Sequence, residues 1–383
     1  MPTVAIDYTP AYEQGGGIGR YVRELIAALA QTDLDPEVNF RLFVTGARRR
    51  DLPPVPNERF VWRTARLSPR WFARIWHRAR VPIPVEAFTG PLALYHATDF
   101  VLPPTYPRTR TLLTVHDLSF VRVPETASPR LKAYLDAVVP RSVRRADHVL
   151  ADSQATKDDL IALYDTPPDK ITVLLSGVDA RFRRIEDAAA RQAVRQTYQI
   201  PERPYIFSVG TVQPRKNYAR LIQALARLRG EGHDLGLVIA GGRGWLEDPI
   251  YAVIRAEGVD DYVRFIGFAD DADLPALYSA ALCTAVPSLY EGFGLPLLES
   301  MACGTPVVTS DRSSLPEVAG DAGLIVDPTD LDALTGALRR LVTEAALRDD
   351  LVRRGYARAA TFTWERSAHQ LAAIYTKLLI NKS

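Results

Sequence analysis

Short apolar segments alternate with helical patterns along the whole chain, and this alternation limits the possible folds more than any other feature. In the first half the segments that resemble buried strands are 4–6, 39–44, 92–95, 111–115 and 148–151. In the second half they are 205–209, 237–240, 263–266, 283–286, 306–309 and 324–326. Strands that alternate with helices predict parallel sheets covered on both faces. The sequence therefore predicts an α/β protein with two doubly wound, Rossmann-like domains.

The length of the chain and the pattern of one predicted helix support a division into two domains. A chain of 383 residues is too long for one ordinary core, so two domains are expected. Between the first two strands, Val22, Leu25, Ile26 and Leu29 recur with the period of a helix face. The boundary is expected at 176–179, after the apolar segment 171–175.

Composition excludes several classes of protein. Apolar residues make up 47% and charged residues 24%, as in soluble globular proteins, and a formal charge of +2 gives no argument for a nucleic-acid partner. The two cysteines, Cys283 and Cys303, lie among apolar neighbours and are expected to be buried reduced thiols. No signal peptide and no apolar run of about 18 residues is evident, so a cytoplasmic protein is expected.

The stretch 291–299, EGFGLPLLE, is the most informative candidate site. Pro296 suits the first position of a helix that continues through the apolar run 296–302. The amides of Phe293, Gly294 and Leu295 would then lie at a helix N-terminus, where phosphate binds well. Glu291 and Glu299 would flank that phosphate, and two carboxylates should contact its neutral, hydroxyl-bearing attachments rather than the anion.

This stretch resembles the EX7E signature of retaining GT-B glycosyltransferases, in particular glycosyltransferase family 4 (group 1). Further stretches that resemble the family follow in the same order as in its members: 15–21, 115–117, 210–217, 302–309 and 315–318. The resemblance implies two Rossmann-like domains that face each other across a cleft. It assigns 1–176 plus about 364–383, the returning last helix, to an acceptor-side domain, and 177–363 to a domain that binds the nucleotide-sugar donor.

The resemblance also implies roles for individual residues. Glu291 should hold hydroxyls of the donor sugar near C1, and Glu299 the two ribose hydroxyls. His116 matches the family histidine that points at the donor sugar's primary hydroxyl, with Asp117 orienting its ring. A histidine at a strand end is otherwise often a structural residue. Residues 152–153 either line the cleft or cap the following helix.

The glycine-rich segment 15–19 follows the first strand and is followed by a helix from Arg20. It is not a dinucleotide fingerprint, because Val22 stands where the third glycine should be. The resemblance implies that Gly17 touches the donor phosphates and that Gly19 leaves room for the acceptor; a flexible strand–helix turn is the alternative. Gly210, in the later family stretch, is assigned to donor binding.

Arg215 and Lys216 follow the strand 205–209. Such a pair is often solvated surface, but at a strand's carboxyl end it can neutralise the charge that builds on a departing diphosphate. With these cations neither a metal nor another cofactor is expected. The acidic triplet 271–273 resembles a metal-binding DxD but is interpreted as a helix start or an edge of the base pocket near Phe268.

The segment 62–80 is basic and aromatic and has no acidic residue. It carries six arginines, at 63, 66, 70, 74, 78 and 80, and the apolar residues Trp62, Trp71, Phe72, Ile75 and Trp76. Tryptophan beside arginine on a helix indicates peripheral docking at an anionic membrane surface, here the inner face. The alternative is that the aromatic residues pack into the domain and the arginines are solvated. Nucleic acid is not favoured, because no binding motif accompanies the segment.

Together these features predict a retaining, metal-independent hexosyltransferase. Stretches 115–120 and 151–157 are most similar to bacterial mannosyltransferases of polysaccharide or glycolipid synthesis. They favour GDP-mannose as donor, with UDP-glucose or another UDP-hexose next, and a saccharide or lipid-linked acceptor. Two alternatives stay open: a GT-B epimerase acting on a sugar nucleotide, and a non-catalytic sugar-nucleotide sensor.

Overall fold

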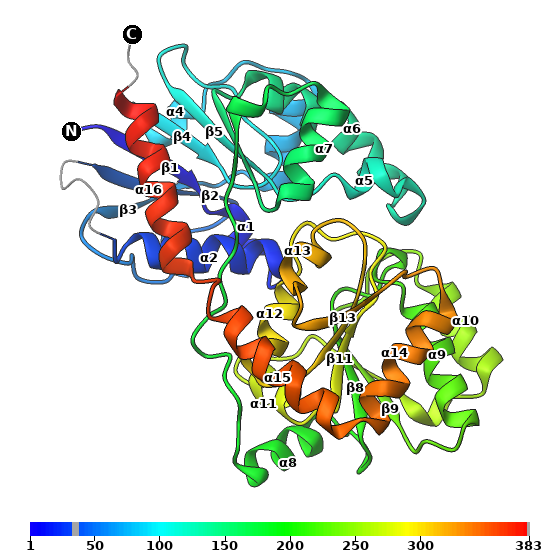
Figure 1. Cartoon of the computed structure of the whole chain (residues 1–383). Coiled ribbons are helices and arrows are strands. Elements are labelled where there is room, and N and C mark those ends of the chain that lie inside the picture. The colour runs from blue at the N-terminus through cyan, green and yellow to red at the C-terminus, as the bar shows by residue number, and fades with distance from the viewer. Residues whose placement is uncertain (33–37, 381–383) are drawn as a thin grey trace. The chain divides into compact units, whose positions relative to one another are not determined.

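The computed structural model describes residues 1–32 and 38–380 (Figure 1). Contacts divide the chain into two compact units. The first unit contains 1–118, 133–177 and 364–383, and the second contains 119–132 and 178–363. Segment 119–132, which the sequence prediction placed in the first domain, thus groups with the second unit. There the indole nitrogen of Trp245 donates a hydrogen bond of 2.7 Å to the carbonyl oxygen of Thr126.

The first unit is built on a parallel sheet. Its strands are β1 (Thr3–Asp7), β2 (Asn39–Thr45), β3 (Phe60–Ala65), β4 (Leu94–Ala97), β5 (Arg110–Val115), β6 (His148–Ala151) and β7 (Ile171–Val173). In the described residues they are ordered β3-β2-β1-β4-β5-β6-β7. Val4 of β1 lies opposite Phe40 of β2 on one side and Leu94 of β4 on the other. The order therefore reverses between β1 and β4, the point at which doubly wound sheets bind ligands.

Helices of the first unit connect these strands. They are α1 (Thr9–Glu13), α2 (Gly17–Leu29), α3 (Pro69–Phe72), α4 (Glu86–Thr89), α7 (Gln154–Tyr164) and α16 (Trp364–Ile380), with α6 (Pro129–Arg145) starting in the second unit and continuing in the first. The last helix, α16, packs against α2 and β4 (Figure 1). The Tyr375 hydroxyl lies 2.8 Å from Nδ1 of His96, which is itself on β4. The chain end is thereby tied to the first sheet.

The segment 62–80 folds differently from the expected helix. Its first part belongs to β3, which pairs in parallel with β2. Phe60 and Trp62 are buried and Val61 and Arg63 are exposed, as the two-residue period of a strand requires. A short α3 and a π-helical turn, Ala73–Arg78, follow. The expectation of a helix is therefore wrong for Trp62 and Arg63, which lie in β3; the apolar Val61 at an exposed position hides the alternation of this strand in the sequence.

The second unit repeats the architecture. Its strands are β8 (Tyr205–Val209), β9 (Gly236–Ala240), β10 (Val263–Gly267), β11 (Cys283–Val286), β12 (Val307–Ser310) and β13 (Gly323–Val326). Within 178–363 they form a parallel sheet of order β10-β9-β8-β11-β12-β13, which reverses between β8 and β11. The two doubly wound, Rossmann-like domains predicted from the sequence are confirmed.

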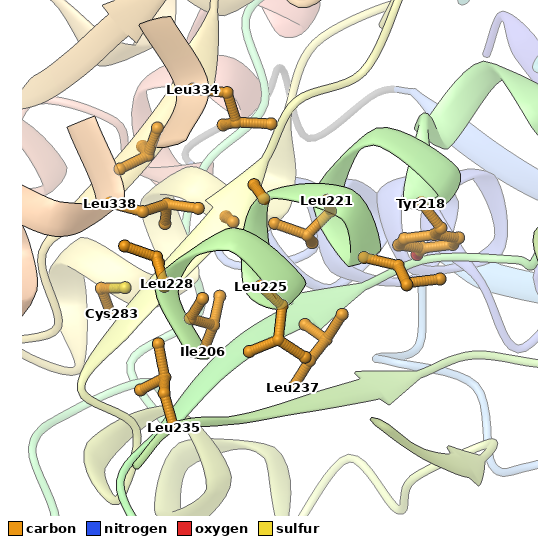
Figure 2. Packing of buried hydrophobic residues seen from close by; sticks show 14 of the residues in the cluster. Ile206, Tyr218, Leu221, Leu225, Leu228, Leu235, Leu237, Cys283, Leu334 and Leu338 are labelled. Carbon is orange, nitrogen blue, oxygen red and sulfur yellow. The ribbon is translucent and has the colours of Figure 1, made fainter. Parts of the chain in front are cut away.

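Both faces of the second sheet are covered by apolar clusters. Alternate residues of β8 and β9 point in opposite directions, so that Ile206 and Leu237 join one cluster and Phe207 and Val238 the other. Figure 2 shows the first cluster, in which helix residues such as Leu225 pack over the strands. The near-continuous apolar strands of the sequence are thus explained by burial on both sides.

The helices of the second unit are α5 (Ser119–Arg122), α8 (Ala188–Thr197), α9 (Tyr218–Gly230), α10 (Asp248–Glu257), α11 (Leu274–Ser279), α12 (Leu295–Ala302), α13 (Leu315–Ala319), α14 (Leu331–Thr343) and α15 (Ala345–Ala359). Several of them, including α9, α11 and α14, supply residues to the two apolar clusters. Cys283 and Cys303 are both buried free thiols, as predicted. Among residues 1–32 and 38–380, no helix has the length and apolar character needed to cross a membrane.

Replacing Tyr375 by Phe tests how α16 is held. Burial, followed by the charge of His116, lowers the pKa of His96 to about 3, so His96 is neutral at pH 7. Without the Tyr375 hydroxyl one of its buried ring nitrogens loses its partner, which should lower the free energy of unfolding by about 1–3 kcal/mol. Equilibrium urea unfolding measures the change. Tyr106→Phe, at a side chain that is 53% exposed, is the matched control and should stay within about 0.5 kcal/mol of wild type; equal stability of both variants would contradict the prediction.

Candidate functional site

Glu291, Arg215 and Lys216 form one buried ionic cluster in the second unit. Oε2 of Glu291 lies 2.8 Å from Nη1 of Arg215, and Oε1 lies 2.7 Å from Nζ of Lys216. Glu291 is only 8% exposed. Arg215 Nη1 also donates to the carbonyl oxygen of Tyr290 at 2.6 Å. The three residues that the sequence prediction treated as separate catalytic groups are therefore a single hydrogen-bonded unit.

The strand order explains why these residues meet. Arg215 and Lys216 lie in a 3₁₀ turn, Pro214–Lys216, after β8, and Glu291 lies in the loop after the neighbouring strand β11. The Leu289 amide donates to the Arg215 carbonyl oxygen at 2.8 Å. The side-chain amide of Asn217 donates to the carbonyl oxygens of Pro287, at 3.1 Å, and Pro328, at 2.8 Å. Backbone and side-chain bonds thus hold the two loops together at the point where the strand order reverses.

Two serines fix the Glu291 loop from the other side. The Glu291 amide donates to Oγ of Ser313 at 2.7 Å. Oγ of Ser314 donates to the carbonyl oxygens of Glu291, at 2.9 Å, and Phe293, at 2.8 Å. Sequence reasoning missed both serines; the only available signal was their position between β12 and the Leu315–Pro316 helix start. They hold the backbone of the site rather than its charges.

Glu291 is charged in this cluster. Burial by itself raises the pKa of Glu291, but the charges of Arg215 and Lys216 outweigh it and lower the pKa to about 2. Glu291 is therefore ionised at neutral pH and lies between two cations. The side chains of Arg215 and Lys216 are only 16% and 11% exposed, so their charges act more strongly than they would in solvent. These cations can attract and stabilise an anion.

Helix α12 begins beside this cluster. It starts at Leu295, one residue earlier than predicted, with Pro296 in its first turn. The preceding Gly294 has φ +113°, a conformation that residues with a side chain rarely adopt. A Cβ there would also lie 2.9 Å from Cδ2 of Leu315. The glycine thus lets the loop that contains Phe293 turn into the helix, whose N-terminal amides favour negative charge.

Glu299 lies one turn into α12 and is almost fully buried. It is 2% exposed, and its Oε2 accepts a hydrogen bond of 2.8 Å from the hydroxyl of Tyr278. Tyr278, on α11, is itself buried. Sequence reasoning did not identify Tyr278, because it comes from another helix 21 residues earlier.

Gly210 follows β8 and Phe268 follows β10, two strands of the same sheet that are separated by β9. A Cβ on Gly210 would lie 2.6 Å from Cε of Lys216, so the glycine makes room for that cation. Phe268 comes directly after β10, and its side chain is 62% exposed. An exposed aromatic ring at a strand's carboxyl end is available for stacking on a planar group.

The two aspartates of the segment 271–273 both interact with other side chains of the protein. Oδ2 of Asp273 accepts from the Tyr198 hydroxyl at 2.8 Å, and Oδ2 of Asp271 lies 3.7 Å from Nη1 of Arg181. Helix α11 begins at Leu274, so the expected helix start is confirmed. In the described parts of the chain, His, Cys, Asp and Glu side chains form no group of three or more that could hold a metal ion.

His116 lies in the first unit, directly after β5. Its Nδ1 lies 2.7 Å from Oδ2 of Asp152, and its Nε2 lies 2.8 Å from the carbonyl oxygen of Thr98. A carbonyl only accepts, so Nε2 carries a proton. Asp152 therefore orients the ring, whereas the sequence had suggested Asp117. The adjacent Ser153 caps α7, accepting from the Thr156 amide at 3.1 Å.

The glycine segment is more regular than expected. Helix α2 already begins at Gly17, and a Cβ added there would meet nothing within 4 Å. A Cβ on Gly19 would lie 1.9 Å from the carbonyl oxygen of Gln14 and 3.0 Å from that of Pro10. Gly19 is therefore required for packing between α2 and the preceding α1, whatever it does for a ligand.

Comparisons with known proteins agree with this architecture. The family described as "Glycosyltransferase Family 4" matches residues 15–182, and that described as "Glycosyl transferases group 1" matches residues 190–358. The chain is 33% identical over 376 residues to "O-antigen chain mannosyltransferase B" of Escherichia coli, covering 95% of this chain and 96% of the relative.

Two further proteins are similar over different extents. A "D-inositol 3-phosphate glycosyltransferase" of Salinispora tropica is 38% identical over 247 residues, covering 61% of this chain and 51% of the relative, so the chain spans about half of that protein. The solved sucrose-phosphate synthase of Thermosynechococcus elongatus superposes with a TM-score of 0.75 at 23% identity and covers 99% of both chains. The latter likeness shows the fold.

The buried His116–Asp152 pair predicts a pH dependence of stability. Burial lowers the pKa of His116, but the Asp152 charge and hydrogen bond outweigh it and raise the pKa to about 9, from an ordinary value of 6.5. A raised pKa contributes stability that is complete below about pH 6.5 and is lost as the pH rises to about 9. A difference of one in the pKa between the folded and unfolded states corresponds to about 1.4 kcal/mol of free energy of unfolding.

The measurement is urea unfolding of wild type and Asp152→Asn at several pH values across this window. The difference in free energy of unfolding between the two proteins should shrink as the pH rises, while groups that titrate in both proteins cancel. Asp158→Asn, at an exposed carboxylate of α7, is the control. A difference that stays constant from pH 6.5 to 9 would exclude a charged pair.

Proposed function

Because the chain belongs to the family 4 (group 1) glycosyltransferases, we propose that it transfers mannose from GDP-mannose, with retention of configuration, to a saccharide or lipid-linked acceptor. The similarity to an O-antigen chain mannosyltransferase over nearly the whole of both chains supports mannose ahead of glucose. UDP-glucose or another UDP-hexose is the next donor. We propose that the protein acts in the cytoplasm, where sugar nucleotides are made.

The observation that carries this proposal is the Glu291–Arg215–Lys216 cluster beside the start of α12. Cleavage of the bond between C1 and phosphate leaves positive charge on the sugar and negative charge on the diphosphate. Arg215, Lys216 and the first amides of α12 stabilise the diphosphate as its charge grows. We propose that they supply this charge without a metal.

The carboxylates then contact the neutral parts of the donor. Glu291, held between two cations, accepts hydrogen bonds from hydroxyls of the donor sugar and lies near the developing positive charge at C1. Glu299 binds ribose hydroxyls, and Tyr278, already bonded to Glu299, positions that carboxylate. Phe268 is proposed to stack on the base, since its ring is exposed.

Retention follows from the proposed proton route. The departing phosphate accepts the proton of the incoming hydroxyl on the same face of the sugar, so no protein nucleophile is required. His116 can contact a sugar hydroxyl only if its Nε2 proton leaves the Thr98 carbonyl oxygen, because Asp152 occupies Nδ1. Its role at the donor sugar, like those of Gly17, Gly19 and Gly210, stays a prediction.

Nucleotide titration is the direct test. Calorimetry with GDP, UDP and ADP in chelator-treated buffer should show binding of GDP. The product formed from GDP-mannose should have the anomeric configuration of the donor by NMR. Binding of UDP alone would indicate a UDP-sugar donor instead of GDP-mannose. Binding of none of the three nucleotides would contradict the transferase proposal.

Substitution of the two carboxylates should separate turnover from nucleotide affinity. Glu291→Gln should lower kcat by roughly 10²–10³-fold, as loss of one group that stabilises transition-state charge does, and should change the GDP dissociation constant much less. Glu299→Gln should mainly weaken GDP binding. Glu257→Gln, on the exposed end of α10, is the control. Full activity of Glu291→Gln would remove Glu291 from the mechanism.

We also propose that the first unit docks on an anionic membrane through a basic face, defined as the exposed arginines 63, 66, 70, 74, 78 and 80 with Trp71. All six arginines are exposed, and Trp71 is 52% exposed with the Arg74 guanidinium 4.9 Å from its ring. Trp62 and Trp76, by contrast, are buried in the unit. Each arginine near an anionic surface adds about 1 kcal/mol of attraction.

Flotation with vesicles of phosphatidylglycerol and phosphatidylcholine tests this surface. Wild type should float with the vesicles at low salt and stay behind with phosphatidylcholine alone. Arg70→Gln combined with Arg74→Gln should reduce flotation, whereas Arg340→Gln combined with Arg353→Gln, on exposed helices of the second unit, should not. Equal flotation of both double variants would assign the effect to overall charge instead of the basic face.

A further inference from the structure

A pocket of about 170 Å³ opens in the first unit at the reversal point of its sheet. Asp7 ends β1, Thr45 ends β2, and Asp99 follows β4, and all three line the pocket. Oγ1 of Thr98 donates to the Asp7 carbonyl oxygen at 2.6 Å and ties the loops after β1 and β4 together. The pocket therefore has the position in its sheet that the Glu291 cluster has in the other. None of the site residues predicted from the sequence lines it.

Three carboxylates, Asp7, Glu13 and Asp99, line this pocket. Oδ1 of Asp7 accepts from the Thr9 amide at 2.9 Å, and Oδ2 of Asp99 accepts from the side-chain amide of Gln14 at 3.3 Å. An ionised carboxylate has room for about four hydrogen bonds, so these contacts leave acceptor capacity on both groups. Burial raises the pKa of Asp7 to about 6, with Asp99 and Glu13 adding to the rise. Hydrogen bonds donated by ligand hydroxyls would stabilise the charged form of such carboxylates.

Aromatic side chains form another wall. The rings of Phe72 and Trp76 are 4.3 Å apart, and those of His77 and Tyr134 are 6.3 Å apart. The Trp76 indole donates to the Ile83 carbonyl oxygen at 2.8 Å, which fixes its orientation. An apolar wall with a few placed polar groups is the usual lining of a small-molecule site.

The backbone that supplies Trp76 and His77 is irregular. They lie in the π-helical turn Ala73–Arg78, and such turns occur frequently at functional sites. Trp76 and His77 line the pocket, whereas Arg74 and Arg78 of the same turn are exposed and belong to the basic face. The turn therefore joins the pocket to the surface that we propose to meet the membrane.

We infer that this cavity, the Asp7 pocket, is a subsite for one neutral hexose ring of the acceptor, with Asp7 and Asp99 accepting from its hydroxyls and the aromatic wall covering its apolar face. This inference rests on the proposed transfer reaction. Two carboxylates disfavour the donor's diphosphate, which suits the cationic cluster of the second unit instead. The volume is below the ~300–1,000 Å³ of sites for larger ligands, and so fits a single ring.

The probes are the methyl α-glycosides of mannose, glucose and galactose, added to the full chain and followed by saturation-transfer NMR and calorimetry. Wild type should bind at least one of them at millimolar concentration. Asp7→Asn and Asp99→Asn should each raise its dissociation constant about tenfold or more, since bonds to a charged group are lost. Tyr134→Phe keeps the ring and should have a smaller effect. Asp51→Asn, an exposed carboxylate of the same unit that does not line the pocket, should bind like wild type.

GDP affinity, measured on the same samples, separates this inference from the proposed function, and urea unfolding shows that the first unit of each variant is folded. Glycoside binding that is lost in Asp7→Asn and Asp99→Asn while GDP affinity is unchanged supports the subsite. Glycoside binding without any GDP binding supports the subsite and contradicts the proposed donor. The subsite is overturned if wild type binds no glycoside, or if both Asp variants bind the glycoside as tightly as wild type does. Displacement of the glycoside by calcium or magnesium ions would also overturn it.

Discussion

The ion pairs of Glu291 with Arg215 and Lys216 connect the loops that follow two neighbouring strands, and the candidate site depends on this connection. Burying three charged groups costs desolvation energy, which is offset only when each charge has close, well-directed partners. Here the ion-pair distances of 2.7 and 2.8 Å meet that condition, and the bonds of the Glu291 backbone to Ser313 and Ser314 hold the loop in place. Removal of the carboxylate would leave two buried cations side by side, so Glu291 holds the positive charge in place before any ligand arrives.

This arrangement combines two kinds of positive potential at one place. Arg215 and Lys216 both contact Glu291, and the first amides of α12 add the positive end of a helix nearby. Under the proposed function, the diphosphate binds beside Glu291 without displacing it. Because the partners are fixed by backbone bonds such as Leu289 to Arg215, little reorganisation is needed when charge develops on the leaving group.

Much of the fold could be predicted from the sequence because its signals are local. The buried strands appear as continuous apolar segments, and the turn before α12 carries a glycine and a proline at positions that only a helix start explains. The failures involve partners that are distant along the chain. Asp152 rather than Asp117 orients His116, Tyr278 reaches Glu299 from another helix, and Gly19 is needed because α1 packs against it. Strand β3 was missed because Val61, at one of its exposed positions, is apolar and hides the two-residue period.

The two sheets share one topology but carry opposite charge at their reversal points. After β8 and β11 the chain places Arg215 and Lys216 around one carboxylate, while after β1 and β4 it places Asp7 and Asp99 beside aromatic rings. A glycosyl transfer needs sites of both kinds, since the donor carries a diphosphate and the acceptor offers neutral hydroxyls. The charge at each reversal point therefore supports the proposed placement of the donor in the second unit and of the acceptor in the first.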